Sequence, residues 1–159
     1  MRRVLMILAV LVCAALVQTA LAEDNPFLGT WKLNVAKSKF QGAPAPQSQT
    51  RTVTQQGNGV KYDFEGTTAN GKPFAFSFVT YYDGAEAAVK GTGVPGGADS
   101  ITLKKANSHK VEGTLRKGGK DVGKVVAEVS KDGKTATVKG TGKTADGKEY
   151  STESVYDKQ

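Results

Sequence analysis

The residues of this sequence best suited to chemistry are aromatic side chains that recur at every second position in two neighbouring stretches. Six residues form this set: Tyr62, Phe64, Phe74, Phe76, Phe78 and Tyr82. Residues two apart in an extended strand point to the same face of a sheet. A row of rings on one face can bury an apolar partner through the hydrophobic effect. Two interpretations stay open: the rings form a packed core, or they line a cavity for a ligand.

Residues that could support catalysis or bind a metal are few. His109 is the only histidine, and it sits beside Ser108 and Lys110 where a loop is expected to meet a strand. A solvated surface histidine is the main interpretation, and a haem ligand is the alternative. One histidine cannot build a multi-ligand zinc site, and the chain has no Gly-x-Ser-x-Gly turn that would expose a nucleophile. The sequence therefore predicts neither an enzyme nor a bound cofactor.

The charged residues give one conditional site. Asp63 and Glu65 share a strand face with Lys61, which indicates a solvated surface rather than an acid–base pair. Arg116 shares the face of Glu112 and is expected to point outward. If the strand register turned it inward, its guanidinium would need an anion, and a ligand carboxylate would fit.

Short strands joined by tight turns must position these side chains. Dipeptides typical of two-residue hairpin turns recur at Asn58-Gly59, Asn70-Gly71, Asp83-Gly84, Gly118-Gly119, Asp132-Gly133 and Asp146-Gly147. The segments between them predict about ten strands: 29–33, 50–56, 60–66, 73–82, 85–90, 100–105, 110–116, 121–130, 135–141 and 149–156. Consecutive hairpins make neighbours in sequence neighbours in space. Because an open sheet of this length would leave two exposed edges, we predict an all-β fold, a single antiparallel up-and-down β-barrel.

Two longer connections interrupt the hairpins. Residues 36–40 could form one helical turn with Asn34 as its N-cap, and residues 41–47 read as an extended proline-rich connector. The second connection covers residues 91–99 and contains Val94-Pro95-Gly96-Gly97. Loops of this size at the mouth of a barrel are commonly mobile and often functional.

The first 22 residues have the pattern of a signal peptide. Arg2 and Arg3 precede an almost unbroken apolar run, and Ala20-Leu21-Ala22 predicts cleavage before Glu23. A retained membrane anchor is the alternative, but the run is short for a spanning helix. We therefore expect a protein that is periplasmic or secreted, with no stable membrane insertion after cleavage.

The remainder of the chain, 23–159, is expected to form one domain. The single cysteine, Cys13, lies in the leader after Val12, where lipidation is not expected. The whole chain has 22 basic and 15 acidic side chains and a formal net charge of +7. Most lysines alternate with Thr, Val or Gly, which is typical of solvated strand faces; attraction to an anionic envelope surface is the alternative. The sequence has no stripe of aromatic and basic residues that would indicate nucleic-acid binding.

The opening of this domain resembles that of the calycin superfamily. Gly29-Thr30-Trp31-Lys32-Leu33, followed by Ser38-Lys39-Phe40, is most similar to the first strand of the intracellular fatty-acid-binding proteins, and the ten-strand count matches as well. The chain also resembles exported bacterial lipocalin-like proteins of unassigned role. The resemblance implies a lipocalin-like barrel with Trp31 packed at its base, where a buried indole N–H needs a partner.

The chain departs from these families at three places. Fatty-acid-binding proteins carry a two-helix lid between their first two strands, and residues 34–49 are too few for it. Their carboxylate anchor is Arg-x-Tyr; here Ser154-Val155-Tyr156 supplies the tyrosine without the arginine. Lipocalins close the barrel base with an arginine against the tryptophan, but Arg51 and Arg116 both lie outside the final strand. The resemblance thus implies the fold and adds Tyr156 to the predicted site, without implying fatty-acid binding.

The expected function is non-enzymatic binding of a small apolar or amphipathic, lipid-like ligand in the cell envelope. Its predicted contacts are Tyr62, Phe64, Phe74, Phe76, Phe78, Tyr82 and Tyr156. The alternative is a protein-binding or inhibitor barrel that acts through its rim loops. An enclosed apolar cavity would favour the ligand, whereas a filled interior with a rigid exposed loop at 91–99 would favour the protein partner.

Overall fold

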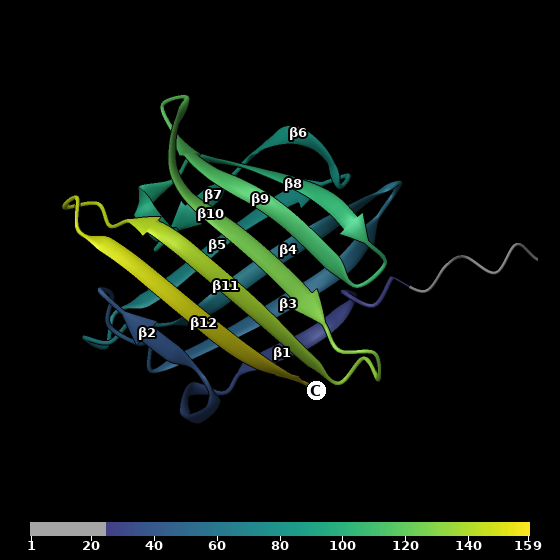
Figure 1. The fold of residues 1–159 in the computed structure, drawn as a ribbon, viewed down its shortest axis with the longest axis horizontal. Helices are drawn as coiled ribbons and strands as arrows, with labels where there is room; N and C mark the ends of the chain where they lie inside the picture. The colour runs from purple at the N-terminus through teal and green to yellow at the C-terminus, as the bar shows by residue number, and fades with distance from the viewer. Residues whose placement is uncertain (1–24) are drawn as a thin grey trace, which may run out of the picture.

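The computed structural model describes residues 25–159, and this part is an all-β barrel (Figure 1). The predicted leader, its cleavage before Glu23 and Cys13 lie outside the described residues. The strands are β1 (Gly29–Leu33), β2 (Lys39–Gln41), β3 (Ser48–Gln56), β4 (Gly59–Thr67), β5 (Pro73–Thr80), β6 (Asp83–Ala88), β7 (Lys90–Thr92), β8 (Ser100–Asn107), β9 (Lys110–Lys117), β10 (Lys120–Val129), β11 (Thr135–Lys143) and β12 (Glu149–Lys158). Two single turns of 3-10 helix, η1 (Val35–Lys37) and η2 (Pro95–Gly97), complete the described elements.

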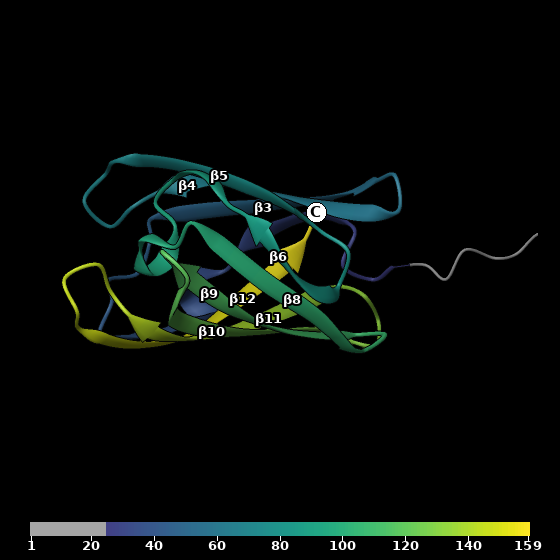
Figure 2. The same ribbon diagram turned by 90° about the horizontal axis from the view of Figure 1, so that it is seen from above.

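The strands form one antiparallel sheet that curls into a nearly closed barrel. Its order is β6-β8-β9-β10-β11-β12-β1-β3-β4-β5-β7, and β2 pairs with β12. Seen from above, β3, β4 and β5 lie on one side and β9 to β12 on the other, so the barrel is flattened (Figure 2). The long hairpins follow chain order, because tight turns force sequential strands to pair. The predicted fold class is confirmed, with twelve strands in place of about ten.

One continuous segment holds the two ends of this sheet together. The prediction of a single strand at 85–90 was wrong here, because the chain changes partner near Val89. Strand β6 pairs with β8, whereas β7 pairs with β5. Residues 83–92 therefore cross the seam between the two sheet edges. Consecutive hairpins cannot produce this arrangement, which is why the turn pattern did not predict it.

The connection after β1 differs in part from its expected form. Asn34 caps η1 as predicted, since its side-chain oxygen accepts a hydrogen bond from the Lys37 backbone N–H at 3.1 Å. Lys39 and Phe40, expected in the helical turn, instead begin β2. This short strand pairs with β12, and Val155 N–H donates to the Ser38 hydroxyl at 2.9 Å. The segment between β1 and β3 thus holds one 3-10 turn and one short strand, not a two-helix lid.

Two of the predicted turns are shifted by local backbone conformation. The turn between β3 and β4 uses Gly57 at φ +56°, so Gly59 already belongs to β4. Gly84 likewise lies inside β6, and the chain reverses at Tyr82, whose φ of +56° makes it the one non-glycine residue of the described part with positive φ. A bulky side chain in this conformation carries backbone strain that the surrounding packing must offset.

One end of the barrel interior is packed solid around Trp31. This indole is fully buried, and its Nε1–H donates to the Phe27 carbonyl at 2.9 Å, which supplies the partner that the sequence required. Other buried members of the packed end are Phe27, Val53, Val60, Tyr62, Phe78, Leu103, Val111, Ala127, Val129 and Ala136. The base-packing role implied for Trp31 is therefore confirmed.

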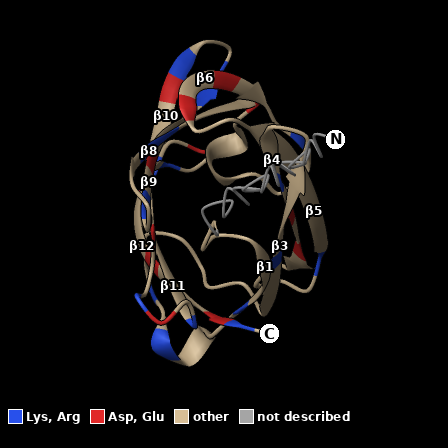
Figure 3. Cartoon of the chain, turned by 90° about the vertical axis from the view of Figure 1, so that its right-hand side faces the viewer, with Lys and Arg blue, Asp and Glu red and all other residues tan. Residues whose placement is uncertain are grey.

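Charged residues lie around the outside of the ring of strands (Figure 3). Lys61 pairs with Asp63, and Lys110 pairs with Glu112, both at 2.8 Å between side chains that are partly or fully exposed. Exposed pairs of this kind contribute little stability. They do confirm that these positions form the solvent face of their strands. None of the helices in residues 25–159 is long and apolar enough to cross a membrane.

Candidate functional site

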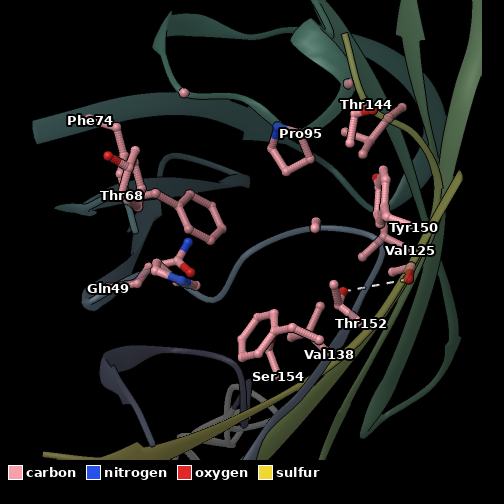
Figure 4. A pocket seen from close by; sticks show the side chains of 18 of the residues that line it. Gln49, Thr68, Phe74, Pro95, Val125, Val138, Thr144, Tyr150, Thr152 and Ser154 are labelled. Atoms are coloured by element: carbon pink, nitrogen blue, oxygen red, sulfur yellow. Dashed lines mark hydrogen bonds between the residues drawn. The ribbon is translucent and has the colours of Figure 1, made fainter. Parts of the chain in front are cut away.

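The other end of the barrel holds a cavity of about 780 Å³ that is open to solvent at its mouth (Figure 4). Its wall comes from the inward-facing positions of the strands, which follow from the two-residue period of each strand. The aliphatic side chains of this wall are Ile101, Leu115, Val125 and Val138, and its phenylalanine rings are Phe40, Phe64, Phe74 and Phe76. The interior is therefore half core and half cavity, and both interpretations of the aromatic face hold, each for one end of the barrel.

The final strand contributes every second residue to this cavity. Tyr150, Thr152, Ser154 and Tyr156 alternate along β12 and all line it. Figure 4 shows Tyr150, Thr152 and Ser154 on the same wall as Val125 and Val138. The Thr152 hydroxyl is turned toward its own sheet, where it donates to the Gly140 carbonyl at 3.5 Å. The wall is thus mainly apolar, with a few hydroxyl groups spaced along one strand.

The mouth of the cavity is built from the connections between strands. Pro44 and Pro46 follow β2, and Pro95 begins η2. Residues 68–70, which connect β4 to β5, and Thr144, which follows β11, complete this rim. Proline fixes its own φ and restricts the residue before it. The two long connections of the sequence therefore meet at the cavity mouth.

The cavity lining contains one polar pair that is hydrogen-bonded within itself. Tyr156 donates a hydrogen bond from its hydroxyl to Gln49 Oε1 at 3.0 Å, and both residues line the cavity. Next to Gln49 on the same face of β3 stands Arg51, which is 2% exposed. Its Cζ lies 4.8 Å from the Tyr156 ring centroid and 5.5 Å from that of Trp31. Arg51 of β3 therefore contacts both the Trp31 and the Tyr156 rings.

The predicted contact residues divide between the two ends of the interior. Phe64, Phe74, Phe76 and Tyr156 line the cavity. The Phe64 and Phe76 rings stack with centroids 4.5 Å apart, and they are cross-strand partners in β4 and β5. These four residues are where the structure brings the predicted site together.

The remaining three predicted residues, Tyr62, Phe78 and Tyr82, lie outside the cavity lining. The Tyr62 and Phe78 rings stack at 5.0 Å in the packed end. The hydroxyls of Tyr62 and Tyr82 are 2.5 Å apart. Burial raises the pKa of the Tyr62 phenol well above its ordinary value and also raises the pKa of Tyr82. Both phenols are therefore neutral at physiological pH and belong to the core.

Several lining residues were absent from the predicted site although the sequence contains a signal for them. Val125, Val138 and Leu115 fall on apolar faces by simple alternation. Tyr150 follows from Tyr156 by counting back along β12 in steps of two. The rim prolines have no such signal, because which connections meet at one end of a barrel depends on strand number and register.

The remaining candidate residues lie on the outside of the barrel. His109 occupies the turn between β8 and β9, with its Nδ1 2.9 Å from the Ser108 hydroxyl, in agreement with a surface histidine. Arg116 points outward, as its strand neighbours predicted, and pairs with Asp121 at 3.0 Å and Glu86 at 3.5 Å. Within residues 25–159, no group of three or more His, Cys, Asp or Glu side chains could hold a metal ion.

No family model and no curated protein matches the chain. Among solved structures, it is similar to the zebrafish ileal bile acid-binding protein complexed with cholic acid, with 13% identity and a TM-score of 0.47 over 84% of this chain and 99% of that one. It is also similar to two redesigned β-barrels bound to DFHBI. The first, mFAP0, is 16% identical with a TM-score of 0.40, covering 84% of this chain and 99% of its own. The second, mFAP1, is 14% identical with a TM-score of 0.38, covering 84% and 95%. At these values the likeness concerns barrel architecture alone, and the fold class stands on the strand order and register described above.

Proposed function

We propose that this protein is a non-enzymatic binder of a small apolar or amphipathic, lipid-like molecule, and that it acts in the cell envelope after export. The cavity at one end of the barrel carries this proposal. Its volume of about 780 Å³ falls within the range of roughly 300–1,000 Å³ that is usual for ligand pockets. A ligand bound there moves its apolar surface from water into contact with aromatic rings and aliphatic side chains.

The composition of the cavity favours an apolar body with few polar groups. The Phe64, Phe74 and Phe76 rings form one wall, and Val125 and Val138 lie in another. Each Å² of apolar surface that a ligand buries against them contributes about 25 cal/mol before the entropy costs of binding. The hydroxyls of β12 offer a small number of places that can fix its orientation.

The alternative function, a protein-binding barrel, requires a filled interior. Here only the end around Trp31 is filled, and the rim connections open onto the hollow end. This asymmetry supports the ligand over the protein partner, because a barrel that works only through its rim gains nothing from an unfilled interior. Core voids reduce stability.

Titration with a neutral hydrophobic fluorophore, N-phenyl-1-naphthylamine, tests the proposal. We expect saturable binding at one site per chain and displacement of the dye by long-chain lipids. Native mass spectrometry of protein recovered without denaturation would identify the class of a co-purifying molecule. Absence of saturable dye binding by a protein that circular dichroism shows to be folded would overturn the proposal.

Export has its own test, because its support lies in the pattern of residues 1–22 alone. We expect the full chain, expressed in a Gram-negative host, to accumulate in the periplasmic fraction with Glu23 as its first residue. N-terminal sequencing of that fraction checks both points. An uncut protein retained in the cytoplasm or the membrane would contradict the envelope location while leaving the binding proposal intact.

A further inference from the structure

The most unusual group in the barrel interior is the guanidinium of Arg51. The residue is 2% exposed, and its Nε and Nη2 atoms are fully buried with no hydrogen-bond partner among the described residues. Buried polar atoms almost always have a partner, and a buried charge without one is costly. An arginine stays protonated under such conditions. The described part of the chain therefore holds a buried cation with two donor atoms, Nε and Nη2, that have no partner.

The surroundings of this guanidinium are aromatic. It lies over the Tyr156 ring at 4.8 Å and over the Trp31 ring at 5.5 Å, so cation–π contacts offset part of its desolvation. None of the ion pairs formed by residues 25–159 includes it. The nearby Tyr62 and Tyr82 hydroxyls hydrogen-bond to each other instead. No described carboxylate is in place to neutralise the charge.

The guanidinium lies beside residues that line the cavity. Tyr156 contacts both, because its ring covers Arg51 while the residue also lines the cavity. Gln49, two residues before Arg51 on the same strand face, and Phe64, its cross-strand partner, line the cavity as well. The Tyr156–Gln49 hydrogen bond is therefore the polar part of the lining that neighbours Arg51.

We propose that Arg51 is the anchor for an acidic head group, so that the ligand is an amphipathic monocarboxylate. This inference rests on the proposed function, since it needs the same cavity to be occupied. The head group displaces the Tyr156–Gln49 hydrogen bond, accepts hydrogen bonds from Arg51 and Tyr156, and supplies the missing counter-charge. The apolar tail then extends along the wall formed by Phe64, Phe76 and Val125 toward the proline-containing mouth. The planar fork of arginine matches the two oxygens of a carboxylate.

A matched pair of ligands tests the anchor directly. A long-chain fatty acid and the alcohol of the same chain length share the tail and differ in charge. In displacement of N-phenyl-1-naphthylamine, we expect the native protein to bind the acid at least about tenfold more tightly than the alcohol. We expect Arg51→Met to abolish this preference by lowering the affinity for the acid. The affinity for the alcohol should stay within about twofold of the native value.

The control variant is Arg116→Met, which removes the other described arginine. Arg116 is exposed and already paired with Glu86 and Asp121, so the ratio should stay as in the native protein. If acid and alcohol bind the native protein equally well, the anchor is refuted while the proposed function stands. If neither ligand displaces the dye and the dye itself does not bind, the proposed function fails.

A spectroscopic measurement on the native protein covers the case in which Arg51→Met does not fold. The Nε–Hε resonance of Arg51 is distinguished from that of Arg116 because it persists in the spectrum of Arg116→Met. On addition of the fatty acid, we expect the Arg51 resonance to shift, because its Nε gains an acceptor. The alcohol should leave it in place. An unmoved resonance with bound acid overturns the proposal.

Discussion

Substituting Val125 by tryptophan separates the hollow end of the barrel from its packed end. Val125 lies in β10, points into the cavity, and has glycine as its cross-strand partner on both sides, Gly113 in β9 and Gly140 in β11. An indole at this position therefore meets no side chain from either of its directly paired residues. It extends into the cavity and takes the place of ligand atoms, with little cost to the native fold.

The magnitude follows from the apolar contact that the indole removes. If it displaces about three ligand methylenes, each worth about 0.8 kcal/mol when buried, binding weakens by about 2 kcal/mol. This corresponds to roughly a thirtyfold increase in the dissociation constant. The assay is dye titration, with urea unfolding to confirm that the stability of Val125→Trp lies within about 1 kcal/mol of the native protein.

The matched control is Val126→Trp, because the neighbouring residue points to the outer face of the same strand. We expect its dissociation constant to equal the native one. A folded Val125→Trp variant that binds the dye and a lipid as tightly as the native protein would show that the ligand does not use this cavity. Equal weakening by both variants would show that the effect comes from the strand rather than from the cavity.

Three further predictions concern the structure that supports the cavity. Gly91→Ala should destabilise the barrel by more than about 1 kcal/mol and speed amide exchange in β7. The reason is that an added Cβ collides with the Ala75 carbonyl across the seam, and that the φ of Gly91 is +119°. Exchange rates in β7 that match the native ones would contradict this prediction. Trp31→Phe should cost about 3 kcal/mol in urea unfolding, because it shrinks the core and orphans the Phe27 carbonyl; a loss below 1 kcal/mol would place the indole outside the core. Burial raises the pKa of Tyr62 in the native protein, so its contribution to folding stability is complete below the unfolded-state pKa of about 10 and is lost as the pH rises toward the native-state pKa. Tyr62→Phe should therefore lose stability less steeply above pH 10 than the native protein. Parallel curves of stability against pH for the two proteins would refute the assignment.

The sequence predicted most of the barrel because its signals are local. Turn dipeptides and strict alternation located the long strands, and they placed Arg116 and Lys61 on the outer face. The seam was not predictable in this way. Whether residues 83–92 pair with β5 or β8 depends on how the whole sheet curls, and no dipeptide encodes that. Strand β2 was missed for a similar reason, since its partner β12 is more than a hundred residues away.

The sequence predicted which side chains of the candidate site share a face, but not which of them line the cavity. Alternation indicated that Phe64, Phe76 and Phe78 share one surface. It gave no indication that the interior is filled near Phe78 and hollow near Phe76, because that division depends on which side chains of the opposite wall meet each ring. Arg51 could have been assigned to the interior, since it alternates with Val53. Its charge concealed this, because arginine on a strand ordinarily indicates solvent.

The proline-containing rim has a consequence for how a guest molecule enters. Pro44, Pro46 and Pro95 hold their segments in shape before any encounter, so uptake does not require a disordered flap to become ordered. Association should then proceed in a single kinetic phase whose rate rises linearly with guest concentration. Dissociation is then the slow step, because the apolar tail of the guest molecule must leave its apolar surroundings for water.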